Sequence, residues 1–327
     1  MNRIEVPLMG MEAKLLGFCL FAIIILSAVS VNLLSQVDQN EVEIVYFETI
    51  IDNRQNITIE AEETSYNRSE VARVATFNIQ IFGKTKMSKP AVVEELVDIF
   101  QRYDLVAVQE IKDIEQNVPW DFLAALNNES GDQWNMVLSD RSGQQEDDES
   151  SQEQYAFYYK KSVFIPRDNG TLYNDSASDS FQREPHIANF ELLDLEGNST
   201  GLDLNLINIH TKPSLAVEEM NSLGDVLNWS ENYYNETDQI ILGDFNADCS
   251  YASYNELINL TISSEEFIWL VPDNADTTVG DSRCAYDRIV TSSDLDGRLS
   301  GNWGIDFAVN NGNVSDHRPV WFDIIRI

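Results

Sequence analysis

The chain has 327 residues, which is enough for one large domain with its own core or for two small ones. Apolar residues make up 43% and aromatic residues 10% of it, which excludes a disordered chain. Only 21 Lys and Arg stand against 55 Asp and Glu, so the net charge is −34 and the surface as a whole repels nucleic acid. We interpret this charge as a solvated acidic surface. High ionic strength screens it, so it does not exclude a DNA substrate.

An uncharged apolar stretch runs from Leu15 to Leu34, with Lys14 just before it and acidic residues after it. A stretch of this length can span a bilayer with its positive flank inside, which places the body of the chain outside. A cleaved signal peptide is the alternative. The chain therefore divides into a short cytoplasmic N-terminus, a membrane anchor or signal peptide, an acidic linker and a globular domain, at residues 1–14, 15–35, 36–70 and 71–327.

The cysteines agree with export. Cys19 lies in the apolar stretch, which leaves Cys249 and Cys284 as an even pair in the body. Such a pair suits one disulfide in an oxidising compartment, although two unrelated buried thiols are the alternative. Frequent N-x-S/T sequons give weak further support. We expect a protein at the cell surface or secreted.

Apolar runs and helical spacing alternate along the body of the chain. The apolar runs predict buried strands at Val71–Ile79, Tyr103–Glu110, Ala156–Val163, Leu202–Ile209, Gln239–Leu242, Tyr286–Val290 and Val320–Ile325. Apolar residues on one face predict helices at Pro90–Gln101 and Val217–Trp229. The alternation predicts an α/β fold.

Polar residues recur where the predicted strands end. They are Asn78, Glu110, His210, Asp244, Asn246 and the Asp316-His317 pair. Strand ends are where α/β proteins place ligands and catalytic groups. Oxygen ligands of this kind suit a hard cation such as Mg²⁺, and the chain has no cysteine–histidine cluster for a structural zinc.

The chain has three histidines, His186, His210 and His317, and two of them stand at strand ends. An imidazole titrates near neutrality, and a carboxylate behind it fixes its tautomer and raises its pKa. Glu153 and Asp287 are candidates for these carboxylates. Phosphodiester hydrolysis needs an activated water and a group that protonates the leaving oxygen, which two such pairs can supply. We interpret His186 as structural.

Several segments together resemble a known family. In chain order they are TFNIQIFG, YDLVAVQEIKD, EQYAFYYK, DSFQREP, INIHTKPS, ILGDFNADCSY, WLVPDNADTT, CAYDRIV and SDHRPV. They resemble the endonuclease/exonuclease/phosphatase superfamily and, more narrowly, its deoxyribonuclease I branch, over about residues 71–327. The resemblance implies a four-layer α/β sandwich of two packed mixed β-sheets with outer helices, and a monomeric, metal-dependent enzyme that cuts DNA without a protein partner.

The resemblance also implies roles for single residues. His210 with Glu153 and His317 with Asp287 resemble the catalytic acid/base pairs. The residues that resemble the phosphate- and metal-binding set are Asn78, Glu110, Asp244, Asn246 and Asp316, with Mg²⁺ or Mn²⁺ as the metal. Lys112 and Arg183 resemble DNA contacts, and Cys249 and Cys284 coincide with the family's main disulfide. Residues that resemble structural Ca²⁺ sites are Asp276 and Thr278 in one loop, and Asp179, Phe181 and Glu184 in another.

Four positions depart from the family pattern. Lys112 stands in place of a groove-contacting arginine, Gln80 in place of another arginine, and Ser151 in place of a stacking tyrosine. A second, short disulfide is missing around Asp175, which weakens the second calcium site. These changes leave the catalytic set whole and reduce the expected grip on DNA. A sphingomyelinase-like or inositol-phosphate enzyme of the same superfamily and an inactive surface-binding module are the alternative functions.

Overall fold

The structure is a computed structural model that describes residues 51–52, 57–58, 66–143 and 152–327. The predicted anchor or signal peptide at 15–35 and most of the linker predicted at 36–70 lie outside the described residues. Within that linker, β1 (Ile51–Asp52) and β2 (Ile57–Thr58) form an antiparallel pair. No helix in the described part of the chain has the length and apolarity that crossing a bilayer requires.

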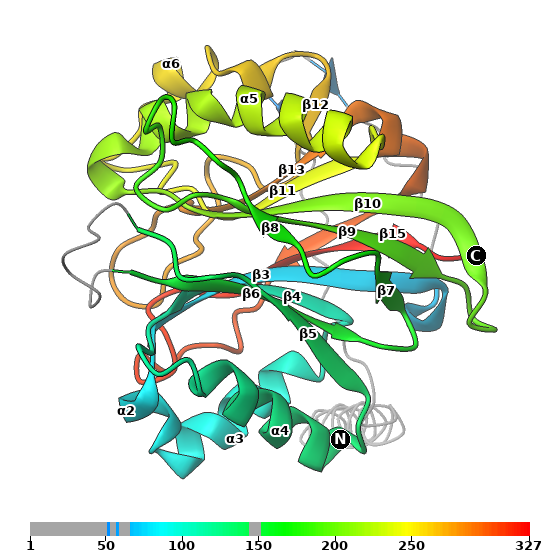
Figure 1. Ribbon diagram of the computed structural model, residues 1–327. Coiled ribbons are helices and arrows are strands. Elements are labelled where there is room, and N and C mark those ends of the chain that lie inside the picture. The colour runs from blue at the N-terminus through cyan, green and yellow to red at the C-terminus, as the bar shows by residue number, and fades with distance from the viewer. Residues whose placement is uncertain (1–50, 53–56, 59–65, 144–151) are drawn as a thin grey trace, which may run out of the picture. The chain divides into compact units, whose positions relative to one another are not determined.

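Two large β-sheets form the centre of the fold (Figure 1). The six-stranded sheet has the order β14-β15-β3-β4-β6-β5, and the seven-stranded sheet has the order β12-β13-β11-β10-β9-β7, with β8 paired to β9. The strands of the first are β3 (Val71–Phe82), β4 (Leu105–Ile111), β5 (Trp134–Leu138), β6 (Gln154–Lys160), β14 (Leu299–Ile305) and β15 (Val320–Ile325). Those of the second are β7 (Phe164–Pro166), β8 (Thr171–Leu172), β9 (His186–Leu193), β10 (Ser199–His210), β11 (Gln239–Asp244), β12 (Phe267–Trp269) and β13 (Asp287–Ser292).

Each sheet has one parallel pair at its centre and antiparallel pairs around it. β3 is parallel to β4, and β10 is parallel to β11. The carboxyl ends of these four strands therefore bring their last residues to one edge of the molecule, where the sequence places the polar residues.

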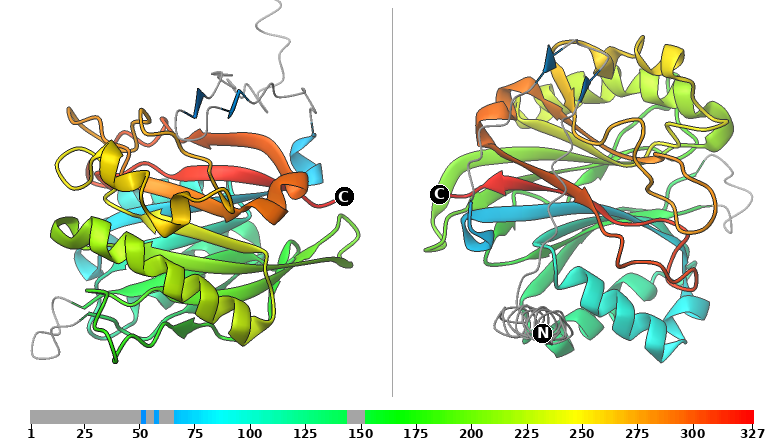
Figure 2. Two further views of the ribbon diagram at one scale, coloured as in Figure 1. Left: turned by 90° about the horizontal axis from the view of Figure 1, so that it is seen from above. Right: turned by 180° about the vertical axis from the view of Figure 1, so that it is seen from behind.

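Helices cover the outer face of each sheet (Figures 1 and 2). The α-helices are α2 (Lys84–Met87), α3 (Pro90–Phe100) and α4 (Val118–Ser130) outside the six-stranded sheet, and α5 (Ala216–Tyr234) and α6 (Tyr254–Leu257) outside the seven-stranded sheet. Short 3₁₀ helices lie at Arg68–Glu70, Pro213–Leu215, Thr261–Ser263 and Ser293–Arg298. The result is the expected four-layer α/β sandwich.

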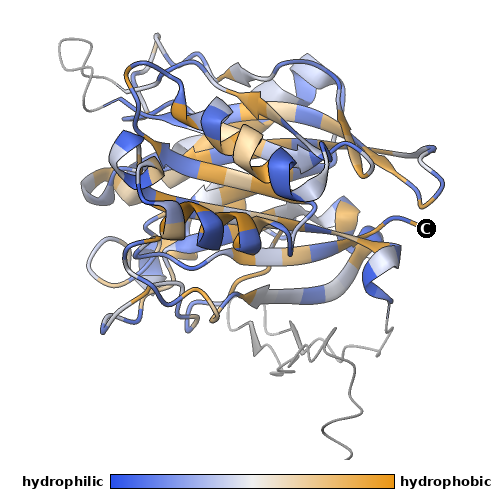
Figure 3. Ribbon diagram, turned by 90° about the horizontal axis from the view of Figure 1, so that it is seen from below, coloured by the Kyte–Doolittle hydropathy of each residue, from blue (hydrophilic) through white to orange (hydrophobic). Residues whose placement is uncertain are grey.

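Three clusters of buried apolar side chains fill the spaces between the layers. Figure 3 shows apolar residues along both the strands and the helices. Below the six-stranded sheet, Phe100 and Phe122 from two helices meet edge to face at 4.8 Å between ring centroids. Both are fully buried, and each contributes about 1.5–3 kcal/mol by leaving water. Between the sheets, Phe157 of one meets Phe190 of the other at 5.7 Å. The two sheets are thus locked face to face, which fixes the edge where their strand ends meet.

The predicted strands and helices are confirmed, with shifted ends. The helix predicted at Val217–Trp229 runs over Ala216–Tyr234, and the strand predicted at Ala156–Val163 already ends at Lys160. Helix Val118–Ser130 was not predicted, because only four of its residues are buried and its apolar stripe is weak.

Candidate active site

Glu110 reaches the site where the pairing of its strand, β4, with both neighbouring strands becomes irregular. The register of β3 against β4 shifts between Asn78 and Phe82, and that of β4 against β6 shifts between Val108 and Ile111. Glu110 has φ of 61° there, a left-handed conformation that is uncommon for a residue other than glycine. Its carboxylate accepts the backbone N–H of Ile81 at 2.8 Å, which holds the bulged strands together.

Gly243 lets the two central strands of the other sheet approach each other beside the site. Its φ is +152°, and a Cβ atom there would lie 1.9 Å from the Ile209 carbonyl oxygen. Only glycine can occupy the position without moving the backbone. As a result His210 and Asp244, the next residues of the two strands, lie directly opposite each other.

The first imidazole belongs to His210. Its Nδ1 lies 2.9 Å from Glu153 Oε2, and its backbone N–H donates to the Tyr155 hydroxyl at 3.1 Å. Two cations contact the other carboxylate oxygen, with Lys112 Nζ at 3.2 Å and Arg183 Nη1 at 3.3 Å. Burial disfavours the charge of Glu153, but these cations and His210 outweigh burial and hold its pKa at about 2.

The second imidazole belongs to His317. Its Nδ1 lies 2.8 Å from Asp287 Oδ2, and the backbone N–H of Asp287 donates to Thr277 Oγ1 at 3.2 Å. Burial disfavours the imidazolium, but the carboxylates of Asp287 and Asp244 outweigh burial and raise the pKa of His317 to about 10. The surroundings of this imidazole therefore favour its charged state.

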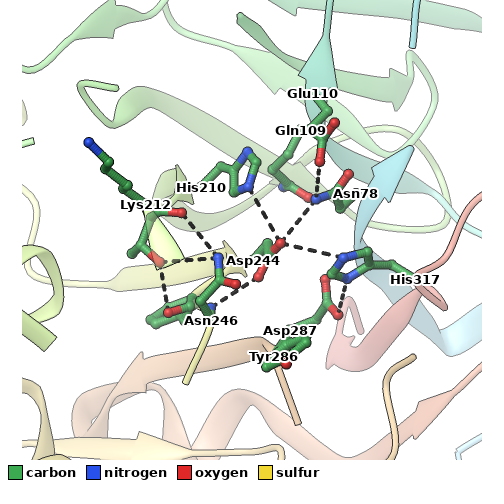
Figure 4. Close-up of polar contacts among 12 residues, drawn as sticks. Asn78, Gln109, Glu110, His210, Lys212, Asp244, Asn246, Tyr286, Asp287 and His317 are labelled. Carbon is green, nitrogen blue, oxygen red and sulfur yellow. Dashed lines mark hydrogen bonds and ion pairs between the residues drawn. The ribbon is translucent and has the colours of Figure 1, made fainter. Parts of the chain in front are cut away.

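The two imidazoles face one carboxylate (Figure 4). Asp244 Oδ2 lies 3.5 Å from His210 Nε2 and 3.6 Å from His317 Nε2. Asn78 Nδ2 donates to the same oxygen at 3.0 Å and to Glu110 Oε1 at 3.1 Å. Side chains from three other segments of the sequence, Asn78, His210 and His317, thus meet around this one oxygen atom of Asp244, and the Nε2 atom of each imidazole is directed at it.

Asn246 and Asp316 close the two sides of this group. The Asn246 N–H donates to Asp244 Oδ1 at 3.0 Å, and its side chain donates to the Thr211 carbonyl oxygen at 3.1 Å. Asp316 Oδ2 accepts the side-chain N–H of Gln80 at 2.7 Å, and Asp316 Oδ1 lies 3.9 Å from His317 Nε2. All nine residues proposed for catalysis and for phosphate and metal binding therefore lie in one connected cluster.

The donor atoms of this cluster suit a hard divalent cation. The carbonyl oxygen of the Asn78 side chain is buried and has no hydrogen-bond partner among the described residues. The Glu110 carboxylate stands beside this amide, with Oε1 3.1 Å from Asn78 Nδ2. A buried amide oxygen and several carboxylates are the ligand set that Mg²⁺ prefers, so these residues fit the metal that the family implies.

The two candidate DNA contacts differ in how far they reach solvent. The Lys112 side chain keeps 29% of its surface exposed. The Arg183 side chain is only 11% exposed, and its guanidinium also donates to the backbone oxygens of His210 and Thr211, both at 3.1 Å. Arg183 is therefore held behind Glu153 and His210, while Lys112 is the one at the surface.

The residues proposed for calcium binding contact other protein groups, and Thr278 forms an isolated β-bridge with His317. Asp276 pairs with Arg318, with 3.2 Å between Oδ2 and Nη1, and the Thr278 hydroxyl donates to the Ser282 carbonyl oxygen at 2.6 Å. In the other loop, Asp179 is exposed, Glu184 accepts the Ser142 hydroxyl at 2.5 Å, and the Phe181 N–H donates to the Asp175 carboxylate at 2.8 Å. Asp175 thus closes the loop where the family's short disulfide is missing.

Sequence reasoning missed a polar link between the sheets directly behind the site. Gln109 Nε2 donates to Asn208 Oδ1 at 2.6 Å and to Thr76 Oγ1 at 3.0 Å. All three side chains are fully buried. A polar residue inside each of three apolar strand runs was the available signal, because buried amides need partners.

A further residue missed is Glu219, in the first turn of α5. Its carboxylate accepts the backbone N–H groups of Gln182 at 3.0 Å and Lys212 at 3.1 Å. Burial raises its pKa to about 7. It ties the segment that carries Arg183 to the segment that follows His210.

The predicted disulfide is present, between Cys249 and Cys284. Cys284 lies three residues before Asp287, and Cys249 lies in the turn that follows Asn246. The bond therefore joins two segments that carry site residues, and it limits how far they can separate in the unfolded chain.

Comparisons with known proteins identify the family of this chain. The model of the Endonuclease/Exonuclease/phosphatase family matches residues 75–317. Deoxyribonuclease-1 of Bos taurus is 35% identical over 229 residues, covering 68% of this chain and 78% of the relative. Deoxyribonuclease-1 of Homo sapiens is 33% identical over 263 residues, covering 76% and 90%. Deoxyribonuclease-1-like 2 of Mus musculus is 36% identical over 221 residues, covering 67% and 76%.

Solved structures show the same fold. An endonuclease/exonuclease/phosphatase protein from Bacteroides vulgatus superposes with a TM-score of 0.55 at 15% identity, covering 79% of this chain and 99% of that one. A humanized D. rerio TDP2 superposes at 0.53 and 13% identity, covering 78% and 99%. From the family match, the relatives and the shared fold together, the chain belongs to the endonuclease/exonuclease/phosphatase family, in its deoxyribonuclease I-like branch.

Proposed function

We propose that this protein is a metal-dependent deoxyribonuclease that hydrolyses phosphodiester bonds of DNA outside the cytoplasm. Its membership of the deoxyribonuclease I-like branch supports the reaction and the substrate. The observation that carries the mechanism is the convergence of two imidazole Nε2 atoms on one oxygen of Asp244, at 3.5 and 3.6 Å. Each imidazole has its own carboxylate on the far side, which fixes the tautomer that leaves Nε2 free to move a proton.

The two histidines divide the proton transfers of hydrolysis between them. One imidazole takes a proton from the attacking water as the new phosphorus–oxygen bond forms. The other gives a proton to the 3′ oxygen as the old phosphorus–oxygen bond breaks, so the products are a 5′-phosphate and a 3′-hydroxyl. Asp244 and Asn246 fix the space between the imidazoles, and Asn78 holds Asp244 and Glu110 in place. Proton transfer of this kind contributes about 10²- to 10⁴-fold in rate.

Glu110, Asn78 and Asp316 would hold a Mg²⁺ or Mn²⁺ ion. When bound, the ion supplies positive charge to the phosphoryl oxygens. The chain itself contributes little such charge near the site, because Arg183 is turned inward and Lys112 pairs with Glu153. Because the side chains supply little positive charge to the phosphoryl oxygens, we expect the reaction to require a bound divalent cation.

Location outside the cytoplasm is the finer part of the proposal. The Cys249–Cys284 disulfide is stable in an oxidising compartment. The apolar stretch from Leu15 to Leu34 would anchor the protein at the cell surface or direct its secretion. We expect the protein to act as a monomer, with DNA as its partner.

Digestion of supercoiled plasmid by the full chain tests the proposal. We expect nicking with Mg²⁺, loss of nicking on chelation with EDTA, and recovery when Mg²⁺ is restored. Lys161→Ala, which removes an exposed lysine paired with Asp132, is the matched control and should cut at the wild-type rate. Nicking that survives exhaustive chelation would contradict the metal requirement. Release of phosphocholine from sphingomyelin without any nicking would favour the lipid-directed alternative.

A further inference from the structure

The segment between β12 and β13 passes directly behind His317. We refer to residues 273–284 as the 273–284 loop. Thr278 forms an isolated antiparallel bridge with His317. The Val279 N–H donates to the Asp316 carbonyl oxygen and the Arg318 N–H to the Thr277 carbonyl oxygen, both at 2.7 Å. This backbone ladder makes the loop one wall of the His317–Asp287 pair.

The side chain of Arg318 occupies the centre of this loop. Its guanidinium Nη1 lies 3.2 Å from Asp276 Oδ2, donates to the Asp276 carbonyl oxygen at 3.4 Å, and also donates to the Thr278 carbonyl oxygen. The side chain is only 13% exposed, and its guanidinium carbon lies 5.0 Å from the centre of the Phe307 ring. The positively charged guanidinium of Arg318 thus contacts three oxygen atoms of the loop.

The remaining oxygens of Asp276 and Thr278 are also engaged within the loop. Asp276 Oδ1 lies 3.1 Å from the Thr278 hydroxyl oxygen and accepts the Thr278 N–H at 3.3 Å. The neighbouring Asp273 pairs with Arg288 at 3.1 Å. Ca²⁺ takes six to eight oxygen ligands, and a guanidinium is never deprotonated in proteins. The residues at Asp276 and Thr278 therefore do not fit the calcium ion that the family resemblance implies.

We propose that the Arg318 guanidinium takes the place of a structural calcium ion in the 273–284 loop, so that the loop keeps its conformation without calcium. A protein cation bound to the loop by several hydrogen bonds does what the ion would do: it neutralises Asp276 and satisfies converging carbonyl oxygens. Unlike an ion, it cannot dissociate, so the loop does not depend on the calcium concentration of the surroundings.

Arg318 is then also a positioning residue for the second catalytic pair. Thr277 Oγ1 accepts the N–H groups of Tyr286 at 3.1 Å and Asp287 at 3.2 Å, so the loop sets where Asp287 meets His317. This consequence rests on the proposed function. The calcium independence of the loop does not.

Trypsin reports on the loop directly in the full chain. Arg283 is exposed and lies in the loop, so cutting after it measures how often the loop opens. Arg318 precedes Pro319 and is not a trypsin site, so its substitution removes no other cut. The fragments stay joined through Cys284 until a reductant is added, which makes the cut visible on a reducing gel. We expect wild-type cleavage to change by less than about twofold between EGTA and millimolar CaCl₂.

Variants separate the guanidinium from the charge that it carries. Arg318→Gln should raise cleavage after Arg283 about tenfold in EGTA, and CaCl₂ should reverse part of the increase. Arg318→Lys keeps the positive charge but has fewer hydrogen-bond donors, so its rate of cleavage after Arg283 should lie between those of the wild type and Arg318→Gln. Arg167→Gln is the matched control, since Arg167 pairs with Asp203 at the surface and is 51% exposed. In plasmid cleavage with Mg²⁺, Arg318→Gln should lower kcat without raising KM, and calcium should restore part of kcat.

Two outcomes overturn the proposal. The first is protection of the wild-type chain by CaCl₂ that Asp276→Asn abolishes, because this would mean that calcium binds beside Arg318. The second is cleavage after Arg283 that is as slow in Arg318→Gln as in Arg167→Gln, because this would mean that the guanidinium does not hold the loop. If Arg318→Gln does not fold, the effect of CaCl₂ on trypsin cleavage of the wild type and of Asp276→Asn still shows whether calcium binds the loop. If no DNA is cut, the proposed function fails while the trypsin result stands.

Discussion

The two imidazole–carboxylate pairs match in geometry and differ in electrostatic surroundings. Nδ1 lies 2.9 Å from a carboxylate oxygen in the His210 pair and 2.8 Å in the His317 pair. Glu153, the carboxylate of the first pair, is held by Lys112 and Arg183. Asp244 lies beside both imidazoles, at 3.5 Å from His210 Nε2 and 3.6 Å from His317 Nε2, and in the second pair Asp316 adds a further carboxylate 3.9 Å from His317 Nε2.

The difference indicates that the same local motif is stabilised in two ways. Around Glu153, cations neutralise the carboxylate, and its pKa of about 2 follows from them. Around His317, several carboxylates favour the imidazolium and raise its pKa to about 10. Removing a carboxylate therefore leaves buried positive charge uncompensated in the first pair and relieves negative charge in the second.

The largest expected effect is on catalysis, where the two pairs should be equivalent. His210→Ala and His317→Ala should each lower kcat for plasmid cleavage by about 10³-fold, since each removes one of the two proton transfers. The double variant should lose little more than either single variant, because the two groups act as a unit. Thermal melting serves as the control for folding. A single variant that retains more than about a tenth of the wild-type kcat would show that its pair is not part of the catalytic machinery.

The next effect separates the pairs by stability. Glu153→Gln should lower the free energy of unfolding by about 3 kcal/mol, because Arg183 and Lys112 lose their shared partner in a buried setting. Asp287→Asn should cost only about 1 kcal/mol, because it exchanges one hydrogen bond for relief from the Asp244 charge. Urea denaturation at neutral pH measures both values. If Asp287→Asn lowers the free energy of unfolding more than Glu153→Gln does, the proposed difference between the two pairs is wrong.

His186 provides a histidine without any carboxylate for comparison. It is fully buried, neither ring nitrogen has a hydrogen-bond partner among the described residues, and burial lowers its pKa to about 3. It stays neutral in the folded protein, whereas the unfolded chain binds a proton below about pH 6.5. Its stabilising contribution is therefore present above pH 6.5 and is lost as the pH falls toward 3.

The variant His186→Gln tests whether His186 makes the protein less stable as the pH falls. The variant cannot gain the proton, so the wild type should lose about 2 kcal/mol more unfolding free energy than the variant between pH 7 and pH 5. Urea denaturation at the two pH values gives the difference. Equal losses in the two proteins would mean that His186 is hydrated or paired in solution.

The smallest effect concerns the exposed cation of the first pair. Lys112→Ala should raise KM for DNA by about threefold to fivefold with little change in kcat, because an exposed lysine contributes about 1 kcal/mol or less. Lys161→Ala again controls for loss of one surface charge. A fall in kcat comparable to that of His210→Ala would mean that Lys112 acts in the chemistry and not in binding.

Sequence patterns determined much of the fold. Apolar runs predicted the central strands because a strand buried on both faces needs apolar side chains at every position. Val71–Phe82 and Gln239–Asp244 are of this kind, and both are confirmed as central strands. In the globular domain, the patterns did not predict strands β5, β7, β8, β9, β12 and β14 or helices α2, α4 and α6. β14 is partly exposed along most of its length and α4 buries only four residues, so neither shows a strong apolar pattern.

The sequence also determined which residue types gather at the strand ends, whereas the tertiary structure decided which of them meet. Asn78 and Asp244 are 166 positions apart, and packing of one sheet on the other brings them to 3.0 Å. The SDHRPV segment identified His317, but only the folded loop shows Arg318 among the oxygens proposed for calcium. Apolar spacing is encoded within single elements, while the contacts of a charged side chain depend on segments distant in sequence, and no local pattern records them.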